Sequence, residues 1–250
     1  MIFYDLSLLE KKHNIDILLA VESGSRAWGF ATPDSDYDIR FVYTRKPKDY
    51  IRVFEISDVI EDRVAGGLMD VSGWDLKKFL FLLAKSNTQC YEWLTSHTTY
   101  IVNDDFKHRA LALAELCFHP TRAYHSYRGM YEHHMHEYDM KKGSKNLIHA
   151  LRPMLCALYI CREEMVPEIN IYKLVDQLRR CGAIDEQQQN VIKTFIENHV
   201  NGLADLVGHS EILNFMGYCE TPKVLELTWT PRREKEEFDS FLHYFVGPHD

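Results

Sequence analysis

Two aspartates separated by a single residue, Asp36 and Asp38, are the side chains of this sequence best placed to do chemistry. They begin the stretch Asp36 to Tyr43, whose alternating pattern predicts a β-strand. Residues two apart on a strand project from the same face. Two carboxylates that close repel each other, so the pair is best explained by a divalent cation bound beside it.

A glycine turn precedes this strand. The apolar run from Ile15 to Ala20 leads into Gly24-Ser25-Arg26, which predicts a buried strand, a turn and the start of a short helix. Such a turn points backbone N–H groups and the positive end of a helix dipole at one place, where phosphate is the usual ligand. The sequence therefore predicts a phosphate-binding turn followed by an acid-bearing strand.

A third acidic position follows the Gly66-Gly67 pair, for which we expect a turn. Asp70 lies in a run that alternates with Met69 and Val71, so it is expected on a strand. Asp75 is the alternative. It directly precedes the amphipathic stretch Leu76 to Leu83 and fits better as a helix N-cap, so Asp70 is the preferred third acid.

These residues carry a resemblance. The string Glu22-Ser23-Gly24-Ser25-Arg26-Ala27-Trp28-Gly29, with Asp34-Ser35-Asp36-Tyr37-Asp38, resembles the signature of the DNA polymerase β nucleotidyltransferase superfamily. It is similar to a branch of predicted nucleotidyltransferases, some of which are linked to RNA ligases in proposed RNA repair pathways. The resemblance is specific over about residues 15 to 95 and loose beyond them.

The resemblance implies an α+β fold. Residues 1–110 are expected to form a polymerase β-like nucleotidyltransferase domain, a small mixed sheet flanked by helices. Residues 111–250 are expected to form an all-helical C-terminal domain, because helical periodicity continues from Phe106 onward without a convincing strand.

The resemblance also implies a reaction, in which a nucleoside monophosphate moves from a nucleoside triphosphate, such as ATP, to an acceptor hydroxyl and pyrophosphate is released. Asp36 and Asp38 would bridge two Mg²⁺ ions, with Mn²⁺ as a substitute. Asp70, which the resemblance places on a strand next to the one that carries Asp38, would bind the ion that activates the acceptor. Gly24 and Ser25 would contact the β and γ phosphates. Arg26 would add positive charge there.

The helical half offers three further candidates for nucleotide binding. A tyrosine stripe at helical spacing (Tyr124, Tyr127, Tyr131, Tyr138) is typical of core packing, with base stacking by Tyr127 as the alternative. Lys145 and Arg152 are expected on one side of a helix that runs from Asn146 to Glu164. Each would contact either a triphosphate or an acidic neighbour, because an unpaired guanidinium is costly to bury.

The thirteen histidines invite a zinc hypothesis. His133, His134 and His136 do not have the i, i+4 spacing of a helical metal site, unless His125 or His149 completes one. A solvated or packed set is the preferred interpretation. The six cysteines contain no C-x-x-C pair, so they predict neither a zinc site nor a disulfide framework.

Composition limits the class of protein. The 250 residues carry a net charge of −8, which argues against broad, sequence-independent binding of nucleic acid. No apolar run approaches the roughly 20 residues of a membrane span, and Met1 to Asp5 lack the basic start of a secretion signal, so we expect a cytoplasmic protein that does not bind membranes.

The sequence leaves the acceptor open among RNA, protein side chains and small hydroxylated molecules, and it does not indicate the oligomeric state. The alternatives to an enzyme are a catalytically silent protein that binds or senses nucleotides, and a toxin–antitoxin partner. The presence of all three expected acids favours the enzyme.

Overall fold

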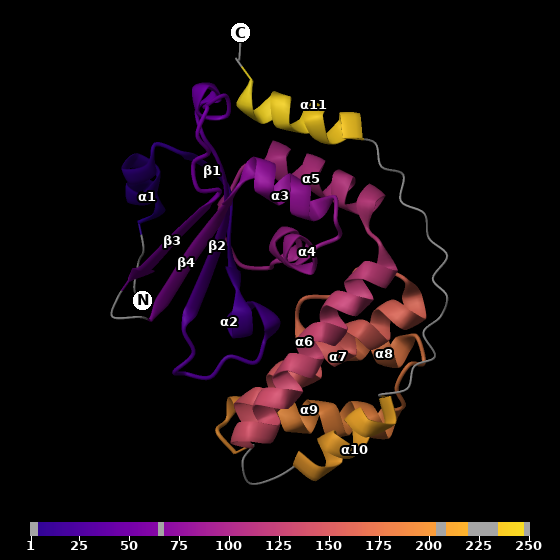
Figure 1. The fold of residues 1–250 in the computed structure, drawn as a ribbon. Coiled ribbons are helices and arrows are strands. Elements are labelled where there is room, and N and C mark those ends of the chain that lie inside the picture. Colours follow the sequence, from indigo (N-terminus) through magenta and orange to yellow (C-terminus); the bar gives the residue numbers. More distant parts are fainter. Residues whose placement is uncertain (1–4, 65–67, 204–208, 220–234, 248–250) are drawn as a thin grey trace. The chain divides into compact units, whose positions relative to one another are not determined.

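The computed structural model describes residues 5–64, 68–203, 209–219 and 235–247 (Figure 1). A five-stranded mixed sheet is followed along the chain by helices. The strands are β1 (Asp16–Ser23), β2 (Tyr37–Thr44), β3 (Val59–Val64), β4 (Met69–Asp75) and β5 (Thr99–Val102), in the spatial order β3-β4-β2-β1-β5. The predicted α+β class, with a small mixed sheet flanked by helices, is confirmed. The expected Gly66-Gly67 turn lies outside the described residues.

The central strand β2 pairs with β1 on one side and β4 on the other. The β1 pairing is antiparallel and sets Ser23 opposite Asp38, whereas the β4 pairing is parallel and sets Asp38 opposite Asp70. Because paired residues point to the same face of a sheet, the carboxylates of Asp38 and Asp70 project side by side. Asp70 therefore lies on a strand next to the one that bears Asp38, as the sequence predicts.

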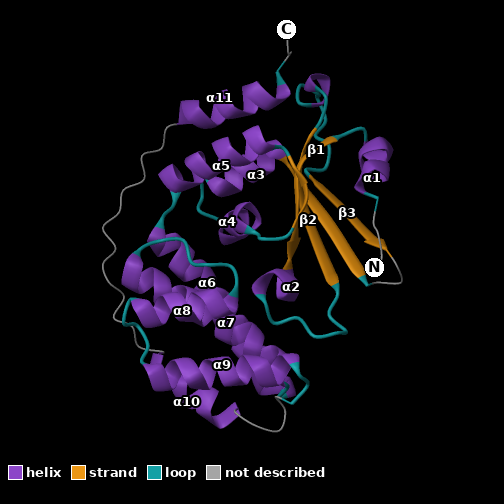
Figure 2. Cartoon of the chain, turned by 180° about the vertical axis from the view of Figure 1, so that it is seen from behind, coloured by secondary structure: helices purple, strands orange, loops and turns teal. Residues whose placement is uncertain are grey.

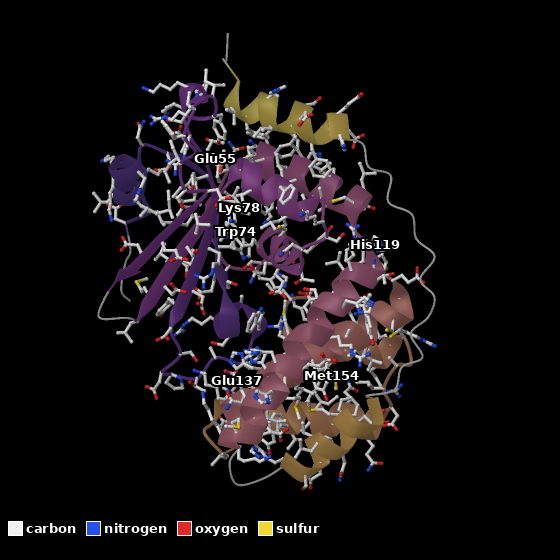
Figure 3. All side chains as sticks on the ribbon, viewed as in Figure 1. Glu55, Trp74, Lys78, His119, Glu137 and Met154 are labelled. Atoms are coloured by element: carbon white, nitrogen blue, oxygen red, sulfur yellow. The ribbon has the colours of Figure 1, made fainter. Side chains whose placement is uncertain are left out.

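The two faces of the sheet are covered by different helices. One face packs on α1 (Leu6–His13) in a core made by Leu6, Leu9, Ile39, Phe41, Tyr43 and Val71, among others. The other face is covered by α3 (Leu76–Leu83), α4 (Thr88–Thr95) and α5 (Asp104–Cys117), as Figure 2 shows. Trp74 of β4, labelled in Figure 3, packs there against Trp93 of α4, with ring centroids 4.1 Å apart. Strand alternation puts Asp38, Arg40 and Asp70 on this second face.

Several helices begin at a residue whose side chain caps the helix N-terminus. Asp5 accepts a hydrogen bond from the Ser7 backbone N–H at the start of α1, and Asn87 accepts one from Gln89 at the start of α4. Along the chain, the short helix α2 (Gly24–Trp28) follows β1, the 3-10 helix η1 (Pro47–Asp49) follows β2, and α11 (Lys235–Val246) is the last helix described.

The chain forms two compact units that interleave along the sequence. The first comprises Met1–Gly24, Asp36–Cys117 and Pro231–Asp250, and the second comprises Ser25–Ser35 and Phe118–Thr230. The sequence-based division into residues 1–110 and 111–250 treats each domain as one continuous stretch. In the structure the short segment after Gly24 groups with the helices, and the C-terminal helix groups with the sheet.

In the described part of the second unit, the regular elements are all helices. Its elements are α6 (Pro120–Lys141), α7 (Ser144–Glu163), α8 (Ile171–Arg180), α9 (Glu186–Val200) and α10 (His209–Cys219). Leu147, Leu151 and Leu155 of α7 are fully buried in its core. The segment Ser25–Ser35 joins this unit through Phe30, whose ring packs edge-on against His149 and His199. Among the described residues, no helix has the length and apolar character that crossing a membrane requires.

Candidate active site

Three aspartates gather around the start of β2. The side chains of Asp38 and Asp70 keep 28% and 40% of their surface exposed, and Asp36, just before the strand, is exposed. Burial raises the pKa of Asp38 above its ordinary value. The Arg40 guanidinium opposes this shift, and the negative charges of Asp70 and Asp36 add to it. The three acids are therefore close enough to influence one another while remaining open to solvent.

Arg40 lies between two of these acids. One of its terminal nitrogens, Nη2, is 3.0 Å from Asp38 Oδ1 and 2.8 Å from Asp70 Oδ2. The other, Nη1, donates to the backbone carbonyl oxygens of Asp70 and Ile39, at 3.0 and 3.2 Å. The sequence analysis did not single out Arg40. The available signal was its position two residues after Asp38, which puts both on one face of a strand.

Glu22 supports the acid-bearing strand from β1. It is only 3% exposed, and its Oε1 accepts a hydrogen bond from the Asp38 backbone N–H at 2.9 Å. The Tyr100 hydroxyl donates to the other carboxylate oxygen of Glu22. A buried carboxylate needs such donors because burial removes its water. Sequence analysis missed this role as well, although a glutamate at the end of a strand that is otherwise apolar is an available signal.

Asp75 has the capping role that the sequence predicts. Its Oδ1 accepts from the Lys77 backbone N–H at 2.9 Å at the start of α3, and its Oδ2 accepts from the Tyr50 hydroxyl at 3.0 Å. Asp75 pairs in register with Tyr43, at the opposite end of β2 from Asp38. Burial raises the pKa of Asp75, while the hydrogen bonds from Lys77 and Tyr50 act against that shift. The N-cap interpretation is confirmed.

The glycine turn lies directly against Asp38. Gly24 has a φ of +61°, a conformation that suits glycine, and a Cβ at this position would lie 2.8 Å from Asp38 Cγ. Ser25 is half-buried, and its carbonyl accepts from the N–H groups of Gly29 and Phe30, at 3.0 and 3.1 Å. Arg26 donates to the Ser35 carbonyl at 2.7 Å, which ties the start of this segment to its end. The contact between Gly24 and Asp38 requires glycine in this turn.

The remaining predicted residues belong to the second unit, and the structure describes them within it. Tyr127 is 2% exposed, which favours the packing interpretation over base stacking. Lys145 is exposed at the start of α7. Arg152 is 3% exposed. Its guanidinium lies 4.6 Å from the ring centroid of Trp28 and donates to the Ile169 carbonyl at 3.3 Å.

The histidines of α6 meet those of neighbouring elements. The rings of His134 and His149 have centroids 5.4 Å apart, and burial lowers the pKa of His149 to about 4, helped by the positive charges of its neighbours. His134 Nδ1 lies 3.1 Å from Glu137 Oε2 (Glu137 is labelled in Figure 3). The ligand atoms of His133, His134 and Glu137 lie within 4.8 Å of one another. Of these histidines, His134 packs against His149, whereas His133 is exposed.

Comparison with known proteins supports the resemblance. A family model described as "RNA repair pathway DNA polymerase beta family" matches residues 2–209. The chain is also 29% identical over 242 residues to the uncharacterized protein YcgL of Bacillus subtilis, an alignment that covers 96% of this chain and 91% of that protein. Both matches span the sheet and most of the helical region. This chain therefore belongs to the RNA repair pathway DNA polymerase beta family.

Proposed function

We propose that this protein is a metal-dependent nucleotidyltransferase that moves a nucleoside monophosphate from a nucleoside triphosphate to an acceptor hydroxyl and releases pyrophosphate. The observation that carries this proposal is the parallel register of β2 and β4. This register sets Asp38 beside Asp70 on one face of the sheet. Asp36 lies two residues before Asp38, and Gly24 of the glycine turn lies against the Asp38 side chain. Membership of a polymerase beta family supports the same chemistry.

The acids fit a hard divalent cation. They offer only carboxylate oxygens, the ligands that Mg²⁺ prefers, and Mn²⁺ accepts the same donors. The electrostatics support this fit, because burial raises the pKa of Asp38, the negative charges of Asp70 and Asp36 add to the shift, and the positive charge of Arg40 opposes it, as a bound cation would. We propose that Asp36, Asp38 and Asp70 hold two such ions, which would supply charge neutralisation for the phosphates and lower the pKa of the acceptor hydroxyl.

The protein residues would orient the substrates and accept a proton. The acceptor oxygen forms a bond to the α-phosphorus as the bond from that phosphorus to the pyrophosphate oxygen breaks, and the hydroxyl proton passes to Asp70. Gly24 and Ser25 would contact the β and γ phosphates, with Arg26 supplying positive charge. No covalent intermediate with the protein is needed, so catalysis would rest on positioning and electrostatics.

The acceptor we propose is the hydroxyl of an RNA end. The family description places its members in an RNA repair pathway, which supports this choice. A net charge of −8 favours local binding of an end over binding along a strand, because the latter needs an extended basic surface.

The proposal is tested by incubating the protein with each nucleoside triphosphate labelled at the α-phosphate, together with Mg²⁺ or Mn²⁺ and RNA that carries free terminal hydroxyls. We expect label in the RNA and release of pyrophosphate. Asp36→Ala and Asp38→Ala should each abolish the transfer. Asp16→Ala is the matched control, since Asp16 is an exposed aspartate of β1 that pairs with Thr44, at the opposite end of β2 from Asp38, and this variant should keep wild-type activity.

Binding without turnover is the outcome that would overturn the proposal. If the protein binds a triphosphate tightly but releases no pyrophosphate with RNA, protein or small hydroxylated acceptors, it is a nucleotide-binding protein and not a transferase. Label transfer that survives in both Asp36→Ala and Asp38→Ala would point to a contaminating enzyme.

A further inference from the structure

Arg40 contacts two of the three acids, Asp38 and Asp70. A single nitrogen, Nη2, bridges one oxygen of Asp38 and one oxygen of Asp70, at 3.0 and 2.8 Å. The adjacent Nη1 donates to the Asp70 backbone carbonyl at 3.0 Å, so the guanidinium is anchored to the same residue through both its side chain and its main chain. The Arg40 side chain keeps only 20% of its surface exposed, which limits screening of these contacts by water.

The bridging position of Nη2 matters because a metal ion would use the same place. A Mg²⁺ ion requires its oxygen ligands at about 2.0–2.1 Å. An ion that bridged Asp38 Oδ1 and Asp70 Oδ2 would therefore overlap with a guanidinium nitrogen that lies 2.8–3.0 Å from those oxygens. The nitrogen and the ion cannot occupy this position together.

We propose that Arg40 is an internal competitor for the ion held between Asp38 and Asp70. The guanidinium offsets the repulsion between the two carboxylates and holds them in register. When the ion binds, the guanidinium leaves Asp38 Oδ1 and Asp70 Oδ2. This inference rests on the proposed function, because it assumes that these acids bind metal.

The two proposed ions are then unequal. Arg40 Nη2 is hydrogen-bonded to both Asp38 and Asp70, so an ion that uses Asp70 must displace the guanidinium from both acids. The ion that depends on Asp36 and Asp38 should therefore bind first, with the nucleotide. The ion that depends on Asp70 should bind more weakly, because it must displace a charged group. Arg40 is thus a positioning residue that sets the order of metal loading, and it makes no contact with substrate in this scheme.

The test measures Mn²⁺ binding by electron paramagnetic resonance in the presence of a non-hydrolysable triphosphate. Wild-type protein should bind one ion tightly and a second weakly. In Arg40→Gln the second ion should bind about tenfold more tightly, since the two charge-assisted hydrogen bonds from Nη2 to Asp38 and Asp70 no longer compete with the ion. Arg40→Lys keeps the charge but not the fork of nitrogens, so its affinity for the second ion should lie between the two.

Arg45→Gln is the matched control. It also removes one positive charge from the β2 region, but Arg45 lies beyond the far end of the strand and contacts Asp75, with Nε 3.9 Å from Oδ2. Arg45 is five positions after Arg40, or about 17 Å away at 3.3 Å per residue, which exceeds the Debye length of roughly 8 Å at physiological salt. Its second Mn²⁺ should bind as in the wild type.

A measurement on the wild-type protein covers the case in which Arg40→Gln fails to fold. The side-chain nitrogen signals of Arg40 are followed by nuclear magnetic resonance as diamagnetic Mg²⁺ is added with the nucleotide. Displacement predicts that the shifts and slowed rotation of a hydrogen-bonded guanidinium are lost at the Mg²⁺ concentration that fills the second site. A guanidinium that stays hydrogen-bonded at saturation overturns the proposal.

Failure of this inference can be told apart from failure of the proposed function. If Asp36→Asn removes Mn²⁺ binding but Arg40→Gln leaves the second affinity unchanged or weaker, the acids bind metal through oxygens that Arg40 does not touch, and only the competitor role is lost. If Asp36→Asn and Asp38→Asn bind Mn²⁺ as the wild type does, the metal site itself is refuted.

Discussion

Gly24→Ala gives the sharpest single test of how the glycine turn and the acids depend on each other. Gly24 has a φ of +61°, and an added Cβ would lie 2.8 Å from Asp38 Cγ and 3.2 Å from Asp38 Cβ. Real Cβ atoms essentially never approach a neighbour within 3.0 Å. The Asp38 side chain would therefore have to turn away from the position in which it contacts Arg40.

Two separate costs add up in this variant. The left-handed backbone of a non-glycine residue costs about 1–2 kcal/mol. Displacing Asp38 also breaks the hydrogen bond from Arg40 Nη2 to its Oδ1, a charge-assisted bond for which about 1.5–3 kcal/mol is typical, less some screening because the Asp38 side chain is 28% exposed. We expect a total loss of about 2–4 kcal/mol in the free energy of unfolding.

Gly182→Ala separates the two costs. Gly182 has a φ of +71°, and nothing lies within 4 Å of its added Cβ, so this variant carries the backbone strain without the collision. It should lose about 1–2 kcal/mol. Both variants are compared with wild type by urea unfolding and by Mn²⁺ binding with a non-hydrolysable triphosphate.

Gly24→Ala should bind Mn²⁺ about tenfold or more weakly than the wild type, and Gly182→Ala should not. Displacing the Asp38 carboxylate removes one charged ligand of the metal, worth at least about 1.4 kcal/mol. If Gly24→Ala binds Mn²⁺ as tightly as Gly182→Ala does, the contact between the turn and Asp38 has no part in the metal site. The phosphate-binding role of the turn would then need independent support.

Three further predictions address other residues. Asp70→Asn should abolish label transfer, while its affinity for the triphosphate, measured by calorimetry, stays within a few fold of the wild type. Asp75→Asn should keep its activity and lose about 1 kcal/mol in the free energy of unfolding. If the two variants show each other's behaviour, Asp75 is the third acid. Glu22→Gln should lower the free energy of unfolding by about 1–3 kcal/mol, because its two hydrogen bonds lose their charge, and equal stability would show that the contacts with Asp38 are dispensable. Burial lowers the pKa of His149 from 6.5 to about 4 in the folded protein, so between these pH values the unfolded chain binds a proton that the folded protein does not. The free energy of unfolding should therefore drop as pH falls from 6.5 to 4, by at most about 1.4 kcal/mol per pH unit. In His149→Gln the free energy of unfolding should depend less on pH over this range.

The sequence predicted the acid-bearing strand because its signals are local. Strand alternation from Asp36 to Tyr43 and the glycine turn both act over a few residues, and the structure contains both features. The same holds for Asp75, whose position before an amphipathic helix identified it as a cap. Asp70 was placed on a strand next to that of Asp38 by a resemblance, and the observed register agrees with that placement.

Strand β5 was missed because it has no alternation to detect. Thr99, Tyr100 and Val102 are exposed, and Ile101 is half-buried, so neither face of the strand carries a consistent apolar pattern. Its pairing with β1 supplies the hydrogen bonds that define it. Contacts of this kind depend on tertiary structure, which overrides weak local preference.

The contacts of charged side chains with residues distant in the sequence could not be predicted from local sequence patterns. Arg152 contacts the Trp28 ring and the Ile169 carbonyl, and the sequence predicted neither of these two contacts. Trp28 lies more than a hundred positions earlier in the chain, and no periodicity links the two. The grouping of Ser25–Ser35 with the helical unit is hidden for the same reason, since it follows from packing between segments that are distant in sequence.

The parallel alignment of β2 with β4 has a consequence for how relatives of this protein can vary. A strand alternates its side chains between two faces, so inserting or deleting one residue between Met69 and Asp75 would send part of that strand to the wrong side. The connection between Thr44 and Val59 carries no such constraint, and Ile51, Val53 and Phe54 within it are exposed. Length differences among family members should therefore collect in that connection and be absent from the two strands.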